Sequence, residues 1–336
     1  MSELLKIQNL SVAFPAYNGT VCAVRDVSFT IYEGEILAMV GESGCGKSVT
    51  AKAIMRLLER TSAEISPESV VEYKGQNLLT LKRKKLNLIR GKDISMVFQD
   101  AMASLNPTMT IGAQMTETIR KHQNLGKVAS VKRAEELLAM VELPEPTEQM
   151  RRYPHQLSGG QRQRVMIAMA LSCDPKLLIA DEPTTALDVT IQAQILGLLQ
   201  KLQKQLGMAV LLITHDLGIV AGVADRVHVM YGGQIIERGK TAEIFHEPKH
   251  PYTAVLLAAI PRRSMEHRSA LYALPGTPPD LRLALNYCPF AARCRYAMPV
   301  CKRQMPEETG GGHPVSCWLT DARAPKVNLT GGPINV

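Results

Sequence analysis

The stretch EILAMVGESGCGKS, residues 35–48, leads from a short apolar segment into a glycine-rich loop and then into a helical pattern. From Gly41 onward it fits G-x-x-x-x-G-K-S, a motif that binds phosphates when a strand precedes it and a helix follows. Its glycines let backbone N–H groups turn inward around phosphates, and the helix adds its positive end. We expect Lys47 to reach the β- and γ-phosphates and the Ser48 hydroxyl to bind Mg²⁺. The residues predicted to line the nucleotide here are Gly41, Glu42, Ser43, Gly44, Cys45, Gly46, Lys47, Ser48 and Val49.

Two acidic residues end a second apolar segment, residues 177–180. A buried strand would place Asp181 at its carboxyl end, where ligands bind in parallel sheets, and there it is predicted to hold Mg²⁺ directly or through water. Glu182 follows and is placed to polarise water against the γ-phosphate. Alone, such a pattern is more often a solvated strand end. The phosphate loop upstream favours the catalytic interpretation.

The sequence LSGGQ, residues 157–161, opens another helical pattern. Ser158 and the amides of Gly159 and Gly160 would form a second anion site at a helix N-terminus, with Gln161 completing the motif. In isolation the simplest interpretation is a capped helix with a glycine turn. One domain does not need two sites for a γ-phosphate, so we expect this site to serve the ATP of a partner chain.

Residues 1 to about 245 alternate strand and helix patterns, which predicts a largely parallel sheet covered on both faces. Gly232-Gly233 lies between two strand patterns and predicts a tight hairpin turn. The composition then changes, because 12 of the 20 prolines lie at Pro248 or later. Such a segment cannot form long helices or central strands, and it needs a cross-link such as a metal site or a disulfide to be ordered. Four of the seven cysteines fall there, with the spacing C-x5-C-x6-C-x15-C: Cys288, Cys294, Cys301 and Cys317.

Composition bounds the location and the partners. The first residues show no basic stretch followed by an apolar one, and no apolar run is long enough to span a bilayer, so we expect a cytosolic chain that a partner would hold at a membrane. In that compartment clustered cysteines indicate metal ligation more than disulfides. The net charge is +8 but aromatics are only 4% of the residues, which disfavours nucleic acid. The positive net charge then indicates either a solvated basic surface or a position near anionic lipid head groups.

The motifs, in their order, resemble the set found in the ATPase domains of ABC transporters over residues 1 to about 245. The set is the phosphate loop, Gln99 after a strand, LSGGQ, Asp181-Glu182, Ala186-Leu187-Asp188, and His215 after another strand. The resemblance implies an α/β fold: a P-loop ATPase with a RecA-like core, an antiparallel β subdomain, and a helical subdomain at about residues 100–170.

The same resemblance implies roles for single residues. Gln99 would touch Mg²⁺ and sense the membrane partner, Asp188 would lie across a dimer interface, and His215 would contact the γ-phosphate. An aromatic residue normally stacks on adenine in this family. Phe14 fits that position by pattern and is preferred over the nearby Tyr17, although a core residue at the end of a strand is the alternative.

Finer motifs resemble the ATPases of oligopeptide, dipeptide and nickel importers. They are FQD with SLNP at 98–107, YPHQL at 153–157, DEPTTALDVT at 181–190 and HPYT at 250–253. The resemblance extends through a small cysteine-rich C-terminal domain, residues 246–336, where relatives bind a 4Fe–4S cluster. Four thiolates are the normal complement of such a cluster. Zinc also accepts four thiolates, but the spacing lacks the C-x2-C of most zinc sites. Free thiols are the third alternative.

The resemblance also implies an assembly. Two ATPase domains, most often different chains, meet head to tail with two permease subunits and an extracytoplasmic solute-binding protein, at the cytoplasmic face of the membrane. Glu182 would act as the base and His215 would stabilise the γ-phosphate. Peptides are the expected cargo. Nickel or another small solute, and a non-transport ABC ATPase with a metal-sensing tail, are the alternatives.

Overall fold

The computed structural model describes residues 2–185, 187–260, 274, 276–283 and 285–329. The chain folds into two compact units. The first comprises Met1–Leu4, Ile31–Ile36 and Thr80–Ile213, and the second comprises Leu5–Thr30, Leu37–Leu79 and Thr214–Val336. In the part of the chain that is described, no helix is both long and apolar enough to cross a bilayer.

Parallel strands form the centre of the first unit. β8 (Leu177–Asp181) lies between β7 (Ile94–Val97) and β9 (Ala209–Thr214). All five residues of β8 are buried, which explains why its sequence is a continuous apolar run rather than an alternating one. The parallel arrangement predicted for this part of the sequence is confirmed, and it brings the carboxyl ends of the three strands to one edge.

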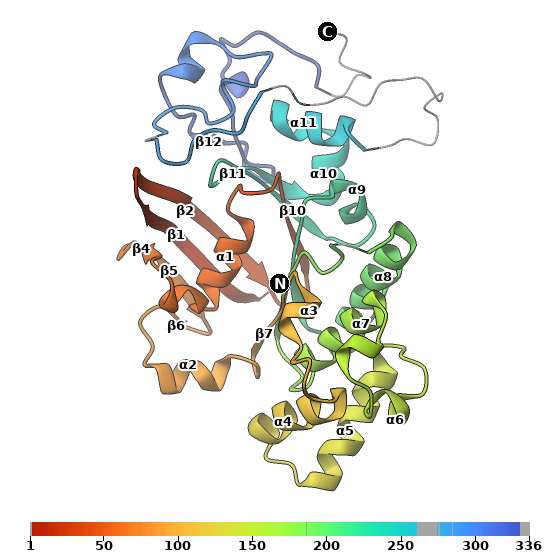
Figure 1. Cartoon of the computed structure of the whole chain (residues 1–336). Coiled ribbons are helices and arrows are strands. Elements are labelled where there is room, and N and C mark those ends of the chain that lie inside the picture. The colour runs from red at the N-terminus through yellow and green to blue at the C-terminus, as the bar shows by residue number, and fades with distance from the viewer. Residues whose placement is uncertain (1, 186, 261–273, 275, 284, 330–336) are drawn as a thin grey trace. The chain divides into compact units, whose positions relative to one another are not determined.

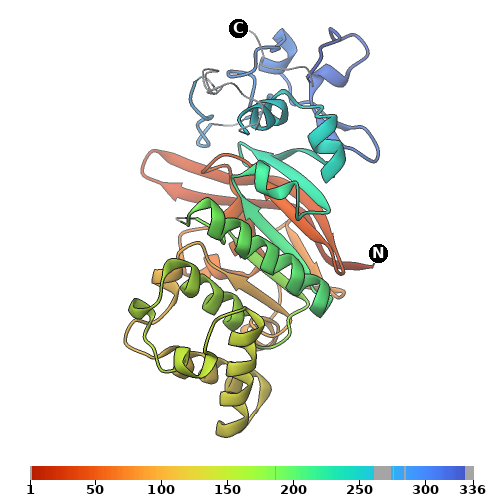
Figure 2. The same ribbon diagram turned by 90° about the vertical axis from the view of Figure 1, so that its right-hand side faces the viewer.

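Helices make up most of the rest of the first unit (Figures 1 and 2). Between β7 and β8 the chain forms short and long helices, of which α4 packs on α5 and α5 on α7. Thr110 begins α4 by accepting a hydrogen bond from the backbone of Ala113. The helices of this unit are α2 (Arg83–Ile89), α3 (Ala101–Ser104), α4 (Ile111–Gln123), α5 (Lys127–Met140), α6 (Pro146–Gln149), η2 (Pro154–Gln156), α7 (Gly159–Ala170) and α8 (Val189–Leu206).

The second unit contains strands of two sheets. In one, β3 (Ile36–Val40) runs parallel to β10 (Arg226–Tyr231), which is paired with β11 (Gln234–Lys240) through the hairpin predicted at Gly232-Gly233. Both glycines have positive φ, so that prediction is confirmed. The other sheet is antiparallel in the pairs that β1 makes with β4 and β5 and that β5 makes with β6. Its strands are β1 (Glu3–Ala16), β2 (Gly19–Tyr32), β4 (Glu64–Ile65), β5 (Val70–Tyr73) and β6 (Gln76–Asn77).

The C-terminal segment adds to the edge of β11. β13 (Val315–Ser316) pairs with β11, and β12 (Glu308–Thr309) pairs with β13. As its prolines predict, the segment has only short regular elements (Figure 1). The remaining helices of the second unit are α1 (Lys47–Ile54), η1 (Leu57–Arg60), α9 (Leu217–Val220), α10 (Thr241–His246), α11 (Pro251–Ala258), η3 (Pro299–Lys302) and η4 (Trp318–Thr320).

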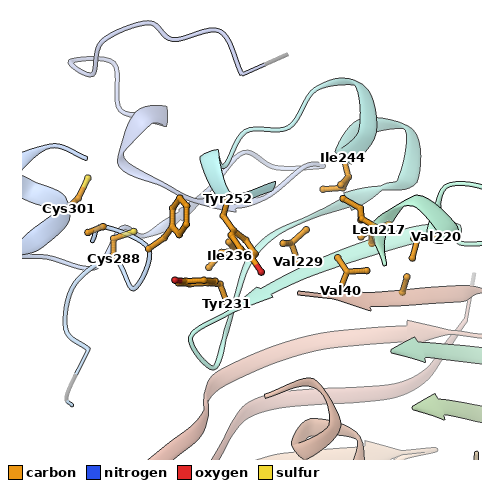
Figure 3. Close-up of a cluster of buried hydrophobic side chains, with 14 residues drawn as sticks. Val40, Leu217, Val220, Val229, Tyr231, Ile236, Ile244, Tyr252, Cys288 and Cys301 are labelled. Carbon is orange, nitrogen blue, oxygen red and sulfur yellow. The ribbon is translucent and has the colours of Figure 1, made fainter. Parts of the chain in front are cut away.

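One hydrophobic cluster joins this segment to the strands (Figure 3). Val40 of β3 and Val229 of β10 belong to the same buried cluster as Tyr252, Cys288 and Cys301. The C-terminal segment therefore buries its apolar side chains in a core that it shares with the sheet, which is how a loop-rich segment becomes ordered.

A buried carboxylate beside this core forms hydrogen bonds that connect β11 to the C-terminal segment. Glu237 of β11 is fully buried and accepts hydrogen bonds from the backbones of Lys249 (2.7 Å) and His250 (3.0 Å) and from Nε2 of His313 (2.8 Å). Burial lowers the pKa of His250 to about 4, so its ring is neutral at pH 7 and Nδ1 accepts the N–H of Tyr252.

Glu237→Ala should lower the free energy of unfolding by about 3 kcal/mol, because it leaves His313 and two buried N–H groups without their acceptor. Urea unfolding followed by the fluorescence of Trp318, the single tryptophan, measures this. Glu308→Ala is the matched control. It removes a half-exposed ion pair with Arg238 and should cost less than about 1 kcal/mol. Equal losses in the two variants would contradict the assignment.

Candidate nucleotide-binding site

The phosphate loop between β3 and α1 takes a shape that only glycine allows at two positions. Gly41 and Gly46 have φ of 156° and 106°. A Cβ atom on Gly46 would overlap the carbonyl oxygen of Ala23, and one on Gly41 would overlap that of Met230. Because Gly46 also precedes α1 without a capping side chain, the first N–H groups of the helix are left for an anion.

Lys47 lies beneath this loop. Its side chain is buried, and Nζ donates hydrogen bonds to the carbonyl oxygens of Gly41 (2.8 Å) and Glu42 (2.9 Å). The loop thus fixes the position of the Lys47 ammonium group through two of its own carbonyls. Carbonyl oxygens are neutral acceptors, so an incoming phosphate oxygen offers the ammonium group a stronger, charge-assisted bond.

The thiol of Cys45 points inward. It is buried, lies 3.6 Å from Nζ of Lys47, and burial raises its pKa. The backbone of Cys45 accepts a hydrogen bond from Gly233 (3.1 Å). Because the thiol points away, we expect Cys45 to contact a nucleotide through its backbone rather than its side chain.

In the first unit, the acidic strand end and the predicted glutamine come together. Asp181 is buried at the end of β8. The carboxylate of Glu182 accepts hydrogen bonds from Nε2 of Gln99 (2.8 Å) and from Oγ1 of Thr185 (2.8 Å). Sequence reasoning predicted both Gln99 and Glu182 but not the bond that joins them. The expected sensor of the membrane partner thus touches the expected base.

The LSGGQ motif begins α7 through a capping box. Oγ of Ser158 accepts the N–H of Gln161, and the Gln161 side chain accepts the N–H of Ser158 (2.9 Å). A Cβ on Gly159 or Gly160 would lie about 3 Å from the side chains of Leu187 and Ile191 respectively, so the glycines let the start of α7 approach Leu187 and the first turn of α8. The capped helix considered from sequence is thus present, and exposed Ser158 remains accessible.

The other predicted residues occupy strand and helix ends. Asp188 caps α8 by accepting the N–H of Ile191 (2.9 Å), while Ala186 lies outside the described residues. Phe14 is half-buried in β1, whereas Tyr17 is fully exposed in the turn that follows. His215 follows β9 and is exposed.

Sequence reasoning missed a part of the C-terminal segment that lies beside the phosphate loop. The carbonyl of Leu281 accepts hydrogen bonds from the backbone of Cys22 (2.9 Å) and from Arg25 (3.0 Å). Pro278 and Pro279 line a small cavity together with Ser43, Gly44 and other residues of the loop. The high density of prolines predicts irregular structure. The same prolines could also have indicated that the backbone here is extended and rigid.

Comparison with known proteins identifies related families and structures. The profile of the ABC transporter family matches residues 24–185, and that of the oligopeptide/dipeptide transporter C-terminal region matches residues 236–301. The chain is 51% identical over 98% of its length to the dipeptide transport ATP-binding protein DppD of Bacillus subtilis (99% of that protein), and 50% identical over 97% to the oligopeptide transport ATP-binding protein OppD of the same organism (92%).

Among solved structures, the dimeric post-hydrolysis state of the ATP-binding cassette MJ0796 with ADP and Pi is similar, with a TM-score of 0.63 and 30% identity. The match covers 71% of this chain and 99% of that one.

Gly46→Ala should weaken nucleotide binding at least about tenfold, because the new methyl group both strains the backbone and meets the carbonyl of Ala23. Titration with a fluorescent ATP analogue measures the dissociation constant. Gly197→Ala is the control: it lies in α8 with open space around it, and should leave binding unchanged while gaining helix stability. Parental affinity in Gly46→Ala would contradict the described loop shape.

Proposed function

Because this chain belongs to the ATP-binding subunits of dipeptide and oligopeptide ABC importers, we propose how its residues bind and hydrolyse ATP. It has the ABC ATPase fold and is an ATP-hydrolysing, membrane-associated subunit that works with permease and substrate-binding partners. The observation that carries the assignment is about 50% identity along nearly the whole length of both named transport proteins.

Lys47 holds the β- and γ-phosphates. When ATP enters, its ammonium group exchanges the carbonyls of Gly41 and Glu42 for phosphate oxygens, while the N–H groups of the loop and of the first turn of α1 bind the remaining ones. Phe14, in β1, supplies the adenine stack in preference to Tyr17. The half-buried position of Phe14 supports this choice, since a fully exposed ring would have to be ordered first.

Hydrolysis depends on Glu182 as the base. Ser48, Gln99 and Asp181 would hold Mg²⁺, which neutralises charge on the phosphates when bound. The carboxylate of Glu182 accepts a hydrogen bond from Gln99, and movement of Gln99 would free it to accept a proton from the attacking water. His215 stabilises the γ-phosphate.

A second ATPase subunit completes each site. Ser158, Gly159, Gly160 and Gln161 bind the γ-phosphate of the partner's ATP, and Asp188 lies at the same interface. The presence of two phosphate-binding motifs in one ATPase domain supports this arrangement. Closure then depends on charge-assisted contacts that exist only while the γ-phosphate is in place, and hydrolysis releases them.

The helical part of the first unit contacts the permease. A cavity of about 580 Å³ there is lined by residues of α4 and its flanking turns, among them Met109, Ala113, Glu117 and Arg120. We place the docking element of the permease in this cavity, with the chain peripheral at the cytoplasmic face. Di- and oligopeptides are the cargo, as the named relatives indicate.

The four C-terminal cysteines hold a 4Fe–4S cluster in this proposal, within a C-terminal domain at residues 246–336. Cys288 and Cys301 belong to one buried cluster against which Cys294 packs, and the N–H of Cys288 donates to the carbonyl of Cys301 (3.1 Å). The backbone N–H of Met298 donates to the sulfur of Cys301 (3.4 Å). Metal binding would displace protons from thiols whose pKa burial raises to about 11 or 12.

Within the described residues, no three histidine, cysteine or acidic side chains come close enough together to hold a single metal ion. The preference for a 4Fe–4S cluster over zinc rests on the cysteine spacing, which lacks the C-x2-C of most zinc sites.

Glu182→Gln should retain ATP binding but lower the rate of hydrolysis at least about 100-fold, because an amide cannot accept the proton of the attacking water. Phosphate release by the assembled transporter measures the rate. Glu142→Gln, at a half-exposed glutamate that pairs with Lys201, should hydrolyse at the parental rate. Parental turnover in Glu182→Gln would mean that another group is the base.

Anaerobically purified protein should contain about four iron and four acid-labile sulfide ions per chain. Cys317→Ser should lose them, whereas Cys173→Ser, at a cysteine of the first unit, should keep them. One zinc ion per chain would assign the alternative metal. A folded tail that holds no metal would refute ligation altogether.

A further inference from the structure

Two groups on the C-terminal side of the chain hold the second residue of the phosphate loop. The backbone N–H of Glu42 donates to the hydroxyl of Tyr252 in α11 (2.8 Å). The carboxylate of Glu42 accepts two hydrogen bonds from the guanidinium of Arg293, at 2.7 Å and 3.1 Å. Both partners lie more than 200 positions away in the sequence but within the same compact unit.

The ion pair is better shielded than an ordinary surface pair. The Arg293 side chain is 6% exposed and that of Glu42 is 29% exposed. Arg293 also donates to the hydroxyl of Tyr231 (3.1 Å), and its guanidinium lies 5.9 Å from the centre of that ring. A planar guanidinium that binds a carboxylate with two bonds fixes the orientation of its partner, which a single lysine bond does not.

An aromatic cluster fixes Arg293 in turn. The ring of Phe290 packs edge-on against Tyr231 at 5.3 Å, and Tyr252 packs against Tyr231 at 4.6 Å. The backbone of Arg293 donates to the carbonyl of Phe290 (3.0 Å), so the arginine stands on the same turn as the ring. The HPYT motif at 250–253 thus contributes Tyr252 to this aromatic cluster.

We propose that Arg293 is a positioning residue of the nucleotide site: by pairing with Glu42 it fixes the phosphate loop in the shape that receives ATP. This inference rests on the proposed function and adds that affinity for ATP depends on the C-terminal segment. Within that segment, Arg293 directly precedes Cys294, one of the four clustered cysteines. Changes in the order of that segment would reach the phosphate loop through this ion pair.

The geometry explains why Glu42 is the point of attachment. Its carbonyl oxygen is one of the two that hold Nζ of Lys47, so a shift of Glu42 also shifts the ammonium group that binds phosphate. A mobile loop loses conformational entropy when it is ordered by ATP binding, and this loss lowers the affinity for ATP. Arg293 removes this cost without touching the nucleotide.

Arg293→Met in the full-length chain should raise the dissociation constant of a fluorescent ATP analogue about tenfold, the loss expected for one buried charge-assisted pair. Arg293→Lys should be intermediate, because it keeps the charge but not the two-bonded geometry. In the assembled transporter the Michaelis constant for ATP should rise more than the maximal rate falls. Arg323→Met, at an exposed arginine of the same segment paired with Asp321, should bind as the parent does.

Glu42→Gln tests the pair from the other end and leaves the C-terminal segment untouched. It should weaken binding by a similar factor, and the double variant should be no worse than either single one. Parental affinity in Glu42→Gln, or additive losses in the double variant, would overturn the proposal even if Arg293→Met does not fold. If the parent itself binds no ATP, the proposed function fails instead.

Discussion

The hydrogen bonds from Nζ of Lys47 to its own loop are the interaction on which the nucleotide site depends. They require a loop that folds back over its lysine, which in turn requires positive φ at Gly41 and Gly46 and close approach to the carbonyls of Met230 and Ala23. The strands that carry these carbonyls therefore set the position of the loop. A loop whose shape is fixed by its own contacts loses little conformational entropy when it binds an anion.

The C-terminal segment is part of this arrangement rather than an appendage. Tyr252, Phe290 and two of the cysteines share a core with β3 and β10, and Glu237 ties the same segment to β11. A segment too rich in proline for helices gains order from a core built by other strands. The ion pair between Arg293 and Glu42 then connects that segment to the phosphate loop.

Local patterns allowed much of this to be predicted from sequence. The parallel strands around β8, the hairpin at Gly232-Gly233 and the phosphate loop all follow from residues within a few positions of one another. The bond between Gln99 and Glu182 could not be predicted, because it depends on how two strand ends meet. The same holds for Glu237 and His313, 76 positions apart, and for the inward thiol of Cys45.

In the proposed mechanism each ATP is bound by the phosphate loop of one chain and by the Ser158 motif of another. The most direct test is the rate of ATP hydrolysis per chain, measured over a dilution series with and without the second ATPase subunit. A shared site predicts that the rate per chain falls toward zero on dilution and returns when the partner is added. A rate per chain that stays constant down to the monomer would contradict the account.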